Sequence, residues 1–415
     1  GWRRGFIYAS LIWGSVATAL TELLSLVQGL TFEHVALAWA AVFVAAGAVS
    51  VRQTVAANPW QRLFVRSSFP EHDTGTALLG VGLLCIVLVT GIIALDKVPA
   101  SYDSMTYHLS RTVHWQQNQS VAYYPTHILR QLYQNPWAEF AILHFRLLSG
   151  DDSLAQGVQW FSMAGSLIGV SLIAERLKRT SHAGLLSAVV AATVPMGVLQ
   201  ASSTQNDYVV AFWLVCAVYS ILITMDASSV PLPRAAAIGV ASGLAILTKG
   251  TAYVYLLPFL CWFGLSRMRV LPLGTLLRVF AVIGSAIVLL NLGHWLRNYD
   301  LFGSPLGLSA GGSVETGEED ISTYGNEAFG PAYLASNIVR NLAIHAGTSS
   351  PQITQALFDG VASLHRWLGI DLSDPRTTWK GKEFAIPRLA FDEDHTGNPV
   401  HLLLIGWASS SVLLS

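Results

Sequence analysis

The chain has 415 residues, of which 52 % are hydrophobic and 12 % are charged, and its formal net charge is -1. A soluble globular domain carries about 25 % charged residues, so the composition argues against a soluble protein. The sequence has no basic block, so nucleic acid is not an expected partner. With a mean hydropathy of +0.48, the chain is predicted to be an all-α polytopic membrane protein.

Apolar runs that approach the ~20 residues needed to cross a bilayer recur along the chain. We expect ten membrane spans, at residues 5–29, 32–50, 76–95, 154–174, 183–200, 208–225, 234–248, 251–266, 275–293 and 400–415. The lack of an A-x-A-type cleavage site after the first run predicts a retained first helix rather than a removed signal peptide.

These spans suggest a division of the chain into parts. We expect two additional N-terminal spans and a loop (1–75), a core of spans (76–293) that includes a long loop (96–153), a second long loop (294–399), and the start of a further span (400–415).

The positions of lysine and arginine in the short loops predict the orientation. Placing Arg3 and Arg4 in the cytoplasm puts four further basic loops on the same side, and both long loops then lie outside. The sequence therefore predicts a multi-pass plasma (inner) membrane protein with a cytoplasmic N-terminus. The same topology puts polar residues from four crossings on the extracytoplasmic face: Asp103, Asp207, Lys249 and Arg297.

The first long loop begins with "YDSMTYHLSR", residues 102–111, directly after a span. Asp103 has two interpretations, a helix N-cap or a general base that takes a proton from an incoming hydroxyl. If the segment is helical, His108 and Arg111 can reach the same region, as an orienting donor and an anion clamp. Tyr107 is a further candidate for substrate contact.

The rest of the first loop, from Thr126 to Gly150, shows helical spacing of apolar residues, which Pro136 should divide into two pieces. Amphipathic helices beside a span are expected to lie in the membrane interface. In the second long loop, residues 332–346 and 353–370 are also predicted to be amphipathic helices.

A second polar stretch, "QASSTQNDYVVAFW" at 200–213, forms a predicted outer turn between two spans. Asp207 begins the returning helix, where an acid complements the helix dipole. Gln205 and Asn206 offer amide donors and acceptors suited to sugar hydroxyls. The three residues are therefore candidates for substrate binding, with a helix start as the plain structural alternative.

Lys249, in "GLAILTKGTAYVYLLPF", is a lone cation in a nearly uncharged stretch. An ionisable residue in such a place is costly, which marks it as a functional candidate whose partner should be an anion such as a lipid phosphate. Arg297, in "HWLRNYDLFGSPLG", ends the ninth span, and its planar guanidinium can hold two phosphate oxygens. Arg111 is the third candidate for the phosphate.

Metal sites are the less favoured alternative. His108, His114 and Glu139 do not have the H-x-x-x-H or H-E-x-x-H spacing of a helical zinc site. The acidic stretch 391–401 could hold Ca²⁺ or Mg²⁺, but a solvated turn explains it more simply. No metal ligand is assigned, and no cofactor is firmly implied.

Taken in order, the stretches "YDSMTYHLSR", "STQNDY", "LTKGTAY" and "LRNYDLFGSPLG" resemble the GT-C glycosyltransferases, from about residue 76 to 307. The subgroup that they most resemble includes protein-mannosyltransferase-like enzymes, lipid A aminoarabinose transferases and Rgt-type bacterial transferases. In that family the acid of the first loop is the catalytic base and basic residues hold the donor phosphate.

The resemblance implies a GT-C-like bundle and an inverting glycosyltransferase. Such an enzyme moves a sugar from a polyprenyl-phosphate donor to an acceptor hydroxyl on a glycan, lipid or protein, within the bilayer and at its extracytoplasmic face. It implies Asp103 as the base and Lys249 and Arg297 as phosphate ligands. A transporter or flippase of lipid-linked saccharides, and a structural subunit of a membrane complex, are the alternatives; a transporter should carry its polar residues toward the bilayer midplane.

Overall fold

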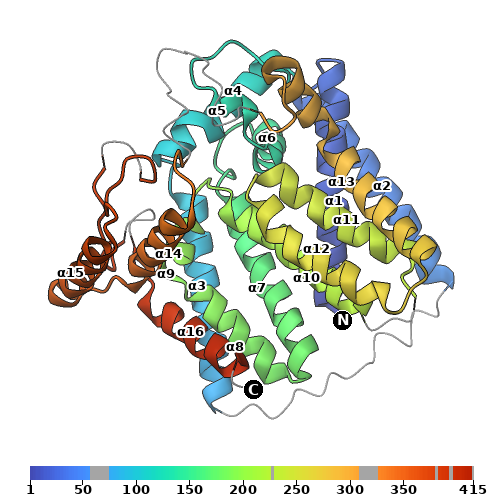
Figure 1. Ribbon diagram of the computed structural model, residues 1–415. Helices are drawn as coiled ribbons and strands as arrows, with labels where there is room; N and C mark the ends of the chain where they lie inside the picture. Colours follow the sequence, from blue (N-terminus) through green and yellow to red (C-terminus); the bar gives the residue numbers. More distant parts are fainter. Residues whose placement is uncertain (57–73, 226–228, 308–325, 379–381, 392–395, 414–415) are drawn as a thin grey trace.

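The computed structural model describes residues 1–56, 74–225, 229–307, 326–378, 382–391 and 396–413. Within those ranges all regular structure is helical and no strand occurs, which confirms the predicted all-α protein (Figure 1). Six helices are long and apolar enough to cross a membrane: α1 (Trp2–Leu26), α2 (Phe32–Ala56), α3 (Thr74–Asp96), α7 (Gly157–Lys178), α10 (Asp207–Met225) and α13 (Leu273–Phe302). The chain is therefore a polytopic membrane protein.

Four shorter apolar helices occupy the positions of the other predicted spans: α8 (Ser181–Ala192), α11 (Leu232–Thr248), α12 (Ala252–Met268) and α16 (Pro399–Leu413). At 1.5 Å per residue, the 17 residues of α11 extend about 25 Å, slightly less than the ~30 Å hydrocarbon core.

The prediction of one unbroken span at 183–200 was wrong. Helix α8 ends at Ala192, and a separate helix α9 (Pro195–Gln200) follows it. The reason is Pro195, which lacks an N–H donor and disfavours helical backbone in the preceding residue. Val194 accordingly has extended backbone angles, with φ -62° and ψ 117°.

The centre of the bundle is formed by α10, α11 and α13, where glycines allow close packing. A Cβ atom added to Gly239 would lie 2.7 Å from the carbonyl oxygen of Ile283 in α13. One added to Gly243, four residues further on, would lie 2.8 Å from Leu290. Two glycines four residues apart on one helix face let two helix backbones approach each other, and here they bring α11 against α13.

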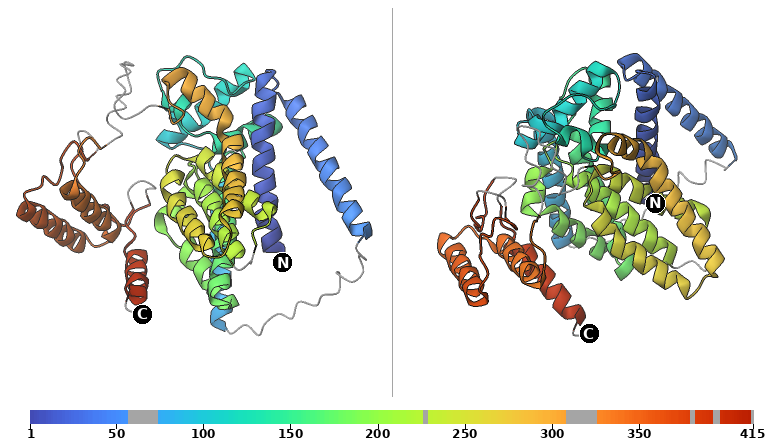
Figure 2. Two further views of the ribbon diagram at one scale, coloured as in Figure 1. Left: turned by 45° about the vertical axis from the view of Figure 1, so that its right-hand side comes forward. Right: turned by 45° about the horizontal axis from the view of Figure 1, so that its top comes forward.

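The first helix, α1, packs on the bundle through one stripe. Its buried residues recur every three or four positions, which is the period of a single helix face, and include Ile7, Leu11, Gly14, Thr18 and Thr21. Helix α2 buries only 11 % of its most apolar window and stands apart from the bundle in Figure 2. The two N-terminal helices therefore differ: α1 is part of the core and α2 is largely at its edge.

The loop 96–153 covers one end of the bundle with short helices, drawn in blue-green to green at the top of Figure 1. They are a π-helical turn (Ser104–His108), α4 (Leu109–Asn118), α5 (Arg130–Tyr133) and α6 (Trp137–Ser149). The break between α5 and α6 falls at Pro136, as predicted. Every residue from Trp137 to His144 is buried, however, so α6 lies inside the protein and is not an amphipathic surface helix.

In the second long loop, α14 (Pro331–Ala346) and α15 (Pro351–Leu368) confirm the two predicted helices. They are joined by a hydrogen bond between the Ser336 hydroxyl and Nε2 of His365, at 2.9 Å. After them, α16 contacts α8, because Nε2 of His401 lies 2.9 Å from the carbonyl oxygen of Val190. The second loop thus returns the chain to the side of the bundle formed by α8.

The two ends of the bundle have different polar residues. At one end, which we call the Asp103 end, the loop 96–153 meets the starts of α7 and α10 and the ends of α3, α11 and α13. At the other, the Arg3 end, Arg3 of α1 forms an ion pair with Glu175 of α7 at 2.8 Å. The helix directions alternate between these ends, as the predicted order of crossings requires (Figure 1).

Candidate active site

Asp103 lies at the Asp103 end, in the short segment between α3 and the π-helical turn. Its carboxylate contacts residues far away in the chain: Nε2 of Gln205 donates to Oδ2 at 3.2 Å, and Nη1 of Arg130 lies 3.6 Å from Oδ1. The side chain makes no capping hydrogen bond to the helix that follows it, which argues against the N-cap interpretation. With one third of its side chain exposed, at 33 %, Asp103 is held in place and still accessible.

Two neighbouring side chains, Arg130 and Tyr107, lie beside the carboxylate of Asp103. The guanidinium of Arg130 lies over the ring of Tyr107, 5.0 Å from its centroid, and the side chain of Arg130 is only 9 % exposed. Burial raises the pKa of Tyr107, and the charge of Asp103 and a hydrogen bond to it raise that pKa further. Tyr107 therefore stays protonated as a hydrogen-bond donor beside the carboxylate, while Arg130 supplies positive charge.

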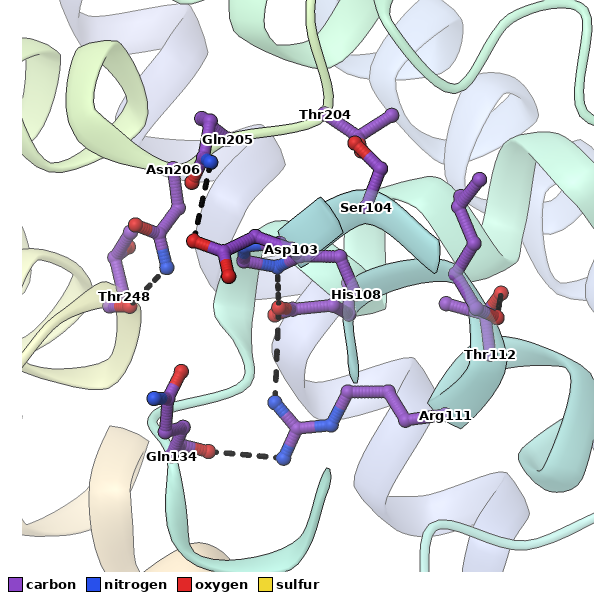
Figure 3. A network of polar contacts seen from close by, with 12 residues as sticks. Asp103, Ser104, His108, Arg111, Thr112, Gln134, Thr204, Gln205, Asn206 and Thr248 are labelled. Atoms are coloured by element: carbon purple, nitrogen blue, oxygen red, sulfur yellow. Dashed lines mark hydrogen bonds and ion pairs between the residues drawn. The ribbon is translucent and has the colours of Figure 1, made fainter. Parts of the chain in front are cut away.

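The turn between α9 and α10 places its amide side chains against the loop 96–153 and the end of α11. The hydroxyl of Thr204 donates to that of Ser104 at 2.5 Å, directly beside Asp103. Nδ2 of Asn206 donates to the carbonyl oxygen of Thr248 at 3.3 Å, so the turn is fixed to α11 as well (Figure 3).

Lys249 follows the last residue of α11, where the backbone becomes extended, with φ -157° and ψ 134°. Its ammonium group contacts Oδ1 of Asp207, the first residue of α10, at 2.6 Å. Both side chains remain partly exposed, 33 % for Lys249 and 43 % for Asp207. The anion that the sequence predicted next to this lysine is thus present in the protein itself, and room for an external anion remains.

Residues 205–207 connect the two halves of the site. Gln205 contacts Asp103 and Asp207 contacts Lys249, so a carboxylate and a cation from segments almost 150 positions apart lie on either side of one short turn. The five predicted residues Asp103, Gln205, Asn206, Asp207 and Lys249 therefore gather at one end of the bundle. Two acids and a cation in this group are partly accessible, whereas Gln205 and Asn206 are 8 % and 5 % exposed. Such a group can bind a polar substrate, accept a proton and stabilise a developing negative charge.

Comparison with known families decides the class of protein. The family model described as dolichyl-phosphate-mannose-protein mannosyltransferase matches residues 134–294. This match supports a membrane glycosyltransferase of the GT-C type. The matched segment is less than half of the chain; it contains residues 205–207 and Lys249, begins after Asp103 and ends before Arg297. No curated protein and no solved structure matches the chain.

Arg111, predicted as a phosphate ligand, is enclosed within the protein. Arg111 is 1 % exposed, and its Nη2 donates to the carbonyl oxygens of Leu132 at 3.2 Å and Gln134 at 2.9 Å. Its Nη1 lies 3.6 Å from Oε1 of Glu139. A guanidinium enclosed in this way cannot reach a phosphate at the surface, so the prediction of a phosphate ligand is not supported.

His108 belongs to the same buried group. Its Nδ1 lies 2.5 Å from Oε1 of Glu139, and both side chains are 1 % exposed. Burial raises the pKa of Glu139, but the charge of Arg111 and the hydrogen bond with His108 outweigh it and lower that pKa overall. We refer to His108, Arg111 and Glu139 as the buried ionic cluster; Figure 3 shows His108 and Arg111 of this cluster below Asp103. All three side chains are buried, so the predicted role of His108 in substrate binding is not supported either.

Arg297 is also engaged within the protein. Its Nη1 and Nη2 donate to the two carboxylate oxygens of Glu22 in α1, at 2.7 and 2.8 Å. This bidentate pair fills the planar fork that the sequence assigned to a phosphate. Arg297 therefore joins α13 to α1 at the Asp103 end, and its prediction as a phosphate ligand is not supported by this geometry.

The sequence analysis assigned no site role to Arg130 or Glu22, and it considered Glu139 only as a possible metal ligand. Arg130 and Glu139 stand singly in apolar helical segments, with no opposite charge three or four positions away, which is a sign that the partner is distant in sequence. Glu22, an acid inside the first apolar run, carries the same sign. An uncompensated charge in an apolar helix predicts a long-range ion pair, although it does not predict the partner.

Metal binding finds no support in the part of the chain that the structure describes, where no group of three or more His, Cys, Asp or Glu side chains could hold an ion. His114 of the predicted set stacks on the ring of Tyr124, at 4.2 Å between centroids. Residues 392–395 of the acidic stretch 391–401 lie outside the described residues, so that candidate stays a prediction.

An apolar cavity of about 460 Å³ lies between α1, α3, α7 and α10. Trp137, the first residue of α6, lines it at the Asp103 end, together with Ala94 and Leu95 of α3. Further toward the middle of the bundle it is lined by Trp13 and Trp213. The glycosyltransferase thus has an apolar space of the kind that binds hydrocarbon, which begins where the loop 96–153 meets the bundle.

Proposed function

We propose that the protein transfers a sugar from a polyprenyl-phosphate donor to an acceptor hydroxyl at the extracytoplasmic membrane face, with inversion at the anomeric carbon. The observation that carries this proposal is the gathering of Asp103 and Lys249 around residues 205–207, with one third of each side chain exposed. A base and a cation must lie on opposite sides of a sugar for a direct displacement, and these two side chains come from different elements that face the same turn.

In the proposed reaction Asp103 accepts the proton of the acceptor hydroxyl as its oxygen attacks the anomeric carbon. The bond from that carbon to the phosphate oxygen breaks, and its electron pair leaves with the polyprenyl phosphate. One new bond forms on the face opposite to the bond that breaks, so the configuration inverts. Gln205 and Arg130 orient the carboxylate.

Lys249 is the proposed ligand of the donor phosphate. Charge grows on the phosphate as it leaves, and a cation fixed in advance stabilises that charge better than mobile water does. Asp207 holds the ammonium group at 2.6 Å, which orients it without enclosing it. Gln205 and Asn206 are the proposed partners of the sugar hydroxyls, since each amide offers both donors and acceptors.

The apolar cavity lined by Trp13, Trp137 and Trp213 is the proposed place of the first isoprene units of the donor. It lies inside the bundle, and it begins at the end where Lys249, the proposed phosphate ligand, lies. Burial of apolar chain contributes about 25 cal/mol per Å². The tail would therefore supply much of the affinity for the donor, and the polar groups would act on the reacting phosphate and sugar.

The proposed location follows from charge. The Arg3 end carries Arg3, Arg4, Arg176 and Arg179 around one pocket, and short loops rich in arginine face the cytoplasm. The Asp103 end then faces the extracytoplasmic side of the inner membrane, where the acceptor, a glycan, lipid or protein hydroxyl, would be met.

The test uses the purified full chain in nanodiscs with radiolabelled polyprenyl-phosphate mannose, and a membrane fraction as the source of acceptor. Asp103→Asn should bind the donor like the wild type and transfer sugar about 10²–10⁴-fold more slowly. Asp152→Asn is the matched control, because Asp152 is an acid of the same long loop that pairs with Arg146 instead. A rate within twofold of wild type for Asp103→Asn would remove this residue from the role of base.

A further inference from the structure

A pocket of about 420 Å³ lies at the Arg3 end, opposite the proposed reaction site. Its walls are formed by the start of α1, the end of α7, the turn to α8 and the second half of α10. Four arginines and one glutamate line it: Arg3, Arg4, Arg176, Arg179 and Glu175. Even with the carboxylate counted, the lining keeps a clear excess of positive charge, which is the requirement for binding an anion.

The glutamate is assigned to one of the four arginines. Both carboxylate oxygens of Glu175 accept from Arg3, at 3.0 and 2.8 Å, and Arg3 also donates to the hydroxyl of Ser171 at 3.1 Å. Arg3 is therefore compensated and fixed in position. Arg4 and Arg179 line the same space and supply the excess positive charge of the pocket, next to Arg176.

A second, independent observation is the hydroxyl of Tyr219, which also lines the pocket. Tyr219 is 1 % exposed, and its hydroxyl has no hydrogen-bond partner within the described part of the chain. Arg4, Arg176 and Arg3 all act electrostatically on this group. A buried hydroxyl without a partner is costly, and one that faces a group of arginines is suited to donate to an anionic oxygen held between them.

The space next to the arginine pocket indicates what carries the anion. A groove of about 420 Å³ runs between α3, α7 and α8, and it shares Arg3, Glu175 and Ser181 with the arginine pocket. The rest of this groove is largely apolar and includes Leu83 and Leu167. A free phosphate ion would use only the first space, whereas a phospholipid would use both.

We propose that the pocket of Arg4, Arg176, Arg179 and Tyr219 binds the phosphate of an anionic phospholipid, with one acyl chain in the groove between α3, α7 and α8. The arginines and the tyrosine hydroxyl bind the phosphate oxygens, as basic pockets between membrane helices do. The acyl chain covers the apolar groove. This site is separate from the donor site, because the two lie at opposite ends of the bundle.

The test measures the lipid retained by the purified full chain in native mass spectrometry, with dioleoylphosphatidylglycerol, dioleoylphosphatidylcholine and inorganic phosphate as probes. Wild type should retain phosphatidylglycerol in preference to phosphatidylcholine. The double variant R4Q/R179Q should lose about 30-fold in apparent affinity for the anionic lipid. R269Q, the same change at an arginine that does not line the pocket, should retain it.

Two further variants test the tyrosine and the groove. Tyr219→Phe should weaken phosphatidylglycerol about tenfold, and without lipid it should melt at the same temperature as wild type or higher, because the hydroxyl has no partner to lose. Gly80→Leu should fill the groove without a clash, since a Cβ atom there meets nothing within 4 Å, and should weaken the phospholipid but not inorganic phosphate.

The proposal is overturned if wild type retains both phospholipids equally, or if R269Q loses as much affinity as R4Q/R179Q. Two results together would show a simple anion site and would exclude a lipid as the ligand. Inorganic phosphate would raise the melting temperature as much as phosphatidylglycerol does, and Gly80→Leu would bind phosphatidylglycerol as tightly as wild type.

Discussion

Two groups of charged residues meet within the short segment 103–111, and they differ mainly in burial. The upper group, Asp103 with Arg130, is partly open, with one third of the carboxylate exposed and 3.6 Å between the charged groups. The lower group, the buried ionic cluster, has side chains that are 1 % exposed and a contact of 2.5 Å between His108 and Glu139. Only the first is accessible to a substrate; the second joins α4 to α6 inside the protein.

The comparison shows that segment 103–111 carries both an accessible charged group and a buried one. Charge near the surface is cheap to keep and available to ligands, whereas charge in the interior must be compensated by neighbours that are fixed in place. The π-helical turn at Ser104–His108 joins the two levels. The following predictions test this division, from the largest expected effect to the smallest.

Glu139→Gln should destabilise the protein by about 3–5 kcal/mol, because it leaves the buried guanidinium of Arg111 without a counter-charge. Thermal unfolding of the purified variant measures this. Asp103→Asn is the comparison and should change stability by no more than about 0.5 kcal/mol. A Glu139→Gln variant that is as stable as wild type but inactive would place the buried cluster in the reaction instead.

Lys249→Gln should lower the rate of sugar transfer about 10²–10³-fold, because it removes the proposed stabiliser of the leaving phosphate. Steady-state transfer with labelled donor measures this, and the melting temperature should be nearly unchanged since the Lys249–Asp207 pair is partly exposed. Lys249→Arg keeps the charge and should recover part of the rate. Equal rates for Lys249→Gln and wild type would assign the phosphate to another cation.

Low pH should destabilise the protein through His144 of α6, another buried ionisable residue. Trp39 donates to Nδ1 of His144 at 2.9 Å, so Nε2 carries the proton and faces the hydroxyl of Thr21, also at 2.9 Å. Burial lowers the pKa of His144 from 6.5 to about 4. The folded state therefore favours the neutral ring, and stability is lost as the pH falls from about 6.5 to about 4.

The expected loss is roughly 3 kcal/mol, from the size of the pKa change. Melting temperatures of wild type and His144→Gln between pH 7 and pH 4 measure it: the variant keeps a donor and an acceptor but has no proton to gain. Parallel curves for the two proteins would show that His144 does not contribute to the acid sensitivity.

The smallest effect is expected for the pair between Glu22 and Arg297, whose side chains are 23 % and 19 % exposed. A double-mutant cycle with Glu22→Gln and Arg297→Gln should give a coupling of about 1 kcal/mol in stability. Donor affinity should change less than threefold in either variant. A tenfold loss of donor affinity in Arg297→Gln alone would restore Arg297 as a phosphate ligand.

Much of the fold could be predicted because hydrophobic runs report membrane spans directly. The apolar runs located ten helices, and the break at Pro136 followed from the chemistry of proline. The break before Pro195 was missed because the surrounding residues are uniformly apolar, so hydropathy continued across a point where the backbone cannot remain helical. Polar residues in apolar surroundings also identified Asp103, residues 205–207 and Lys249, which the fold brings together.

The pairing of charges could not be predicted in the same way. Sequence placed Arg111, Arg297 and Lys249 in one class, as cations near the outer ends of spans. In the folded chain Arg111 pairs with Glu139, Arg297 with Glu22, and Lys249 with Asp207. Each partner is contributed by a different helix. Only the packing of those helices therefore leaves Lys249 accessible and encloses Arg111 and Arg297 more fully.

The sequence by itself therefore determined the all-α membrane class, the positions of the spans and the polar segments at one end of the bundle. Hydropathy and charge are properties of each residue and need no knowledge of its neighbours in space. Tertiary structure alone decided which ionisable groups are buried, which are open and which charges compensate one another. Burial and Coulomb interaction depend on distances between atoms, and packing sets those distances among residues as far apart in the chain as Glu22 and Arg297.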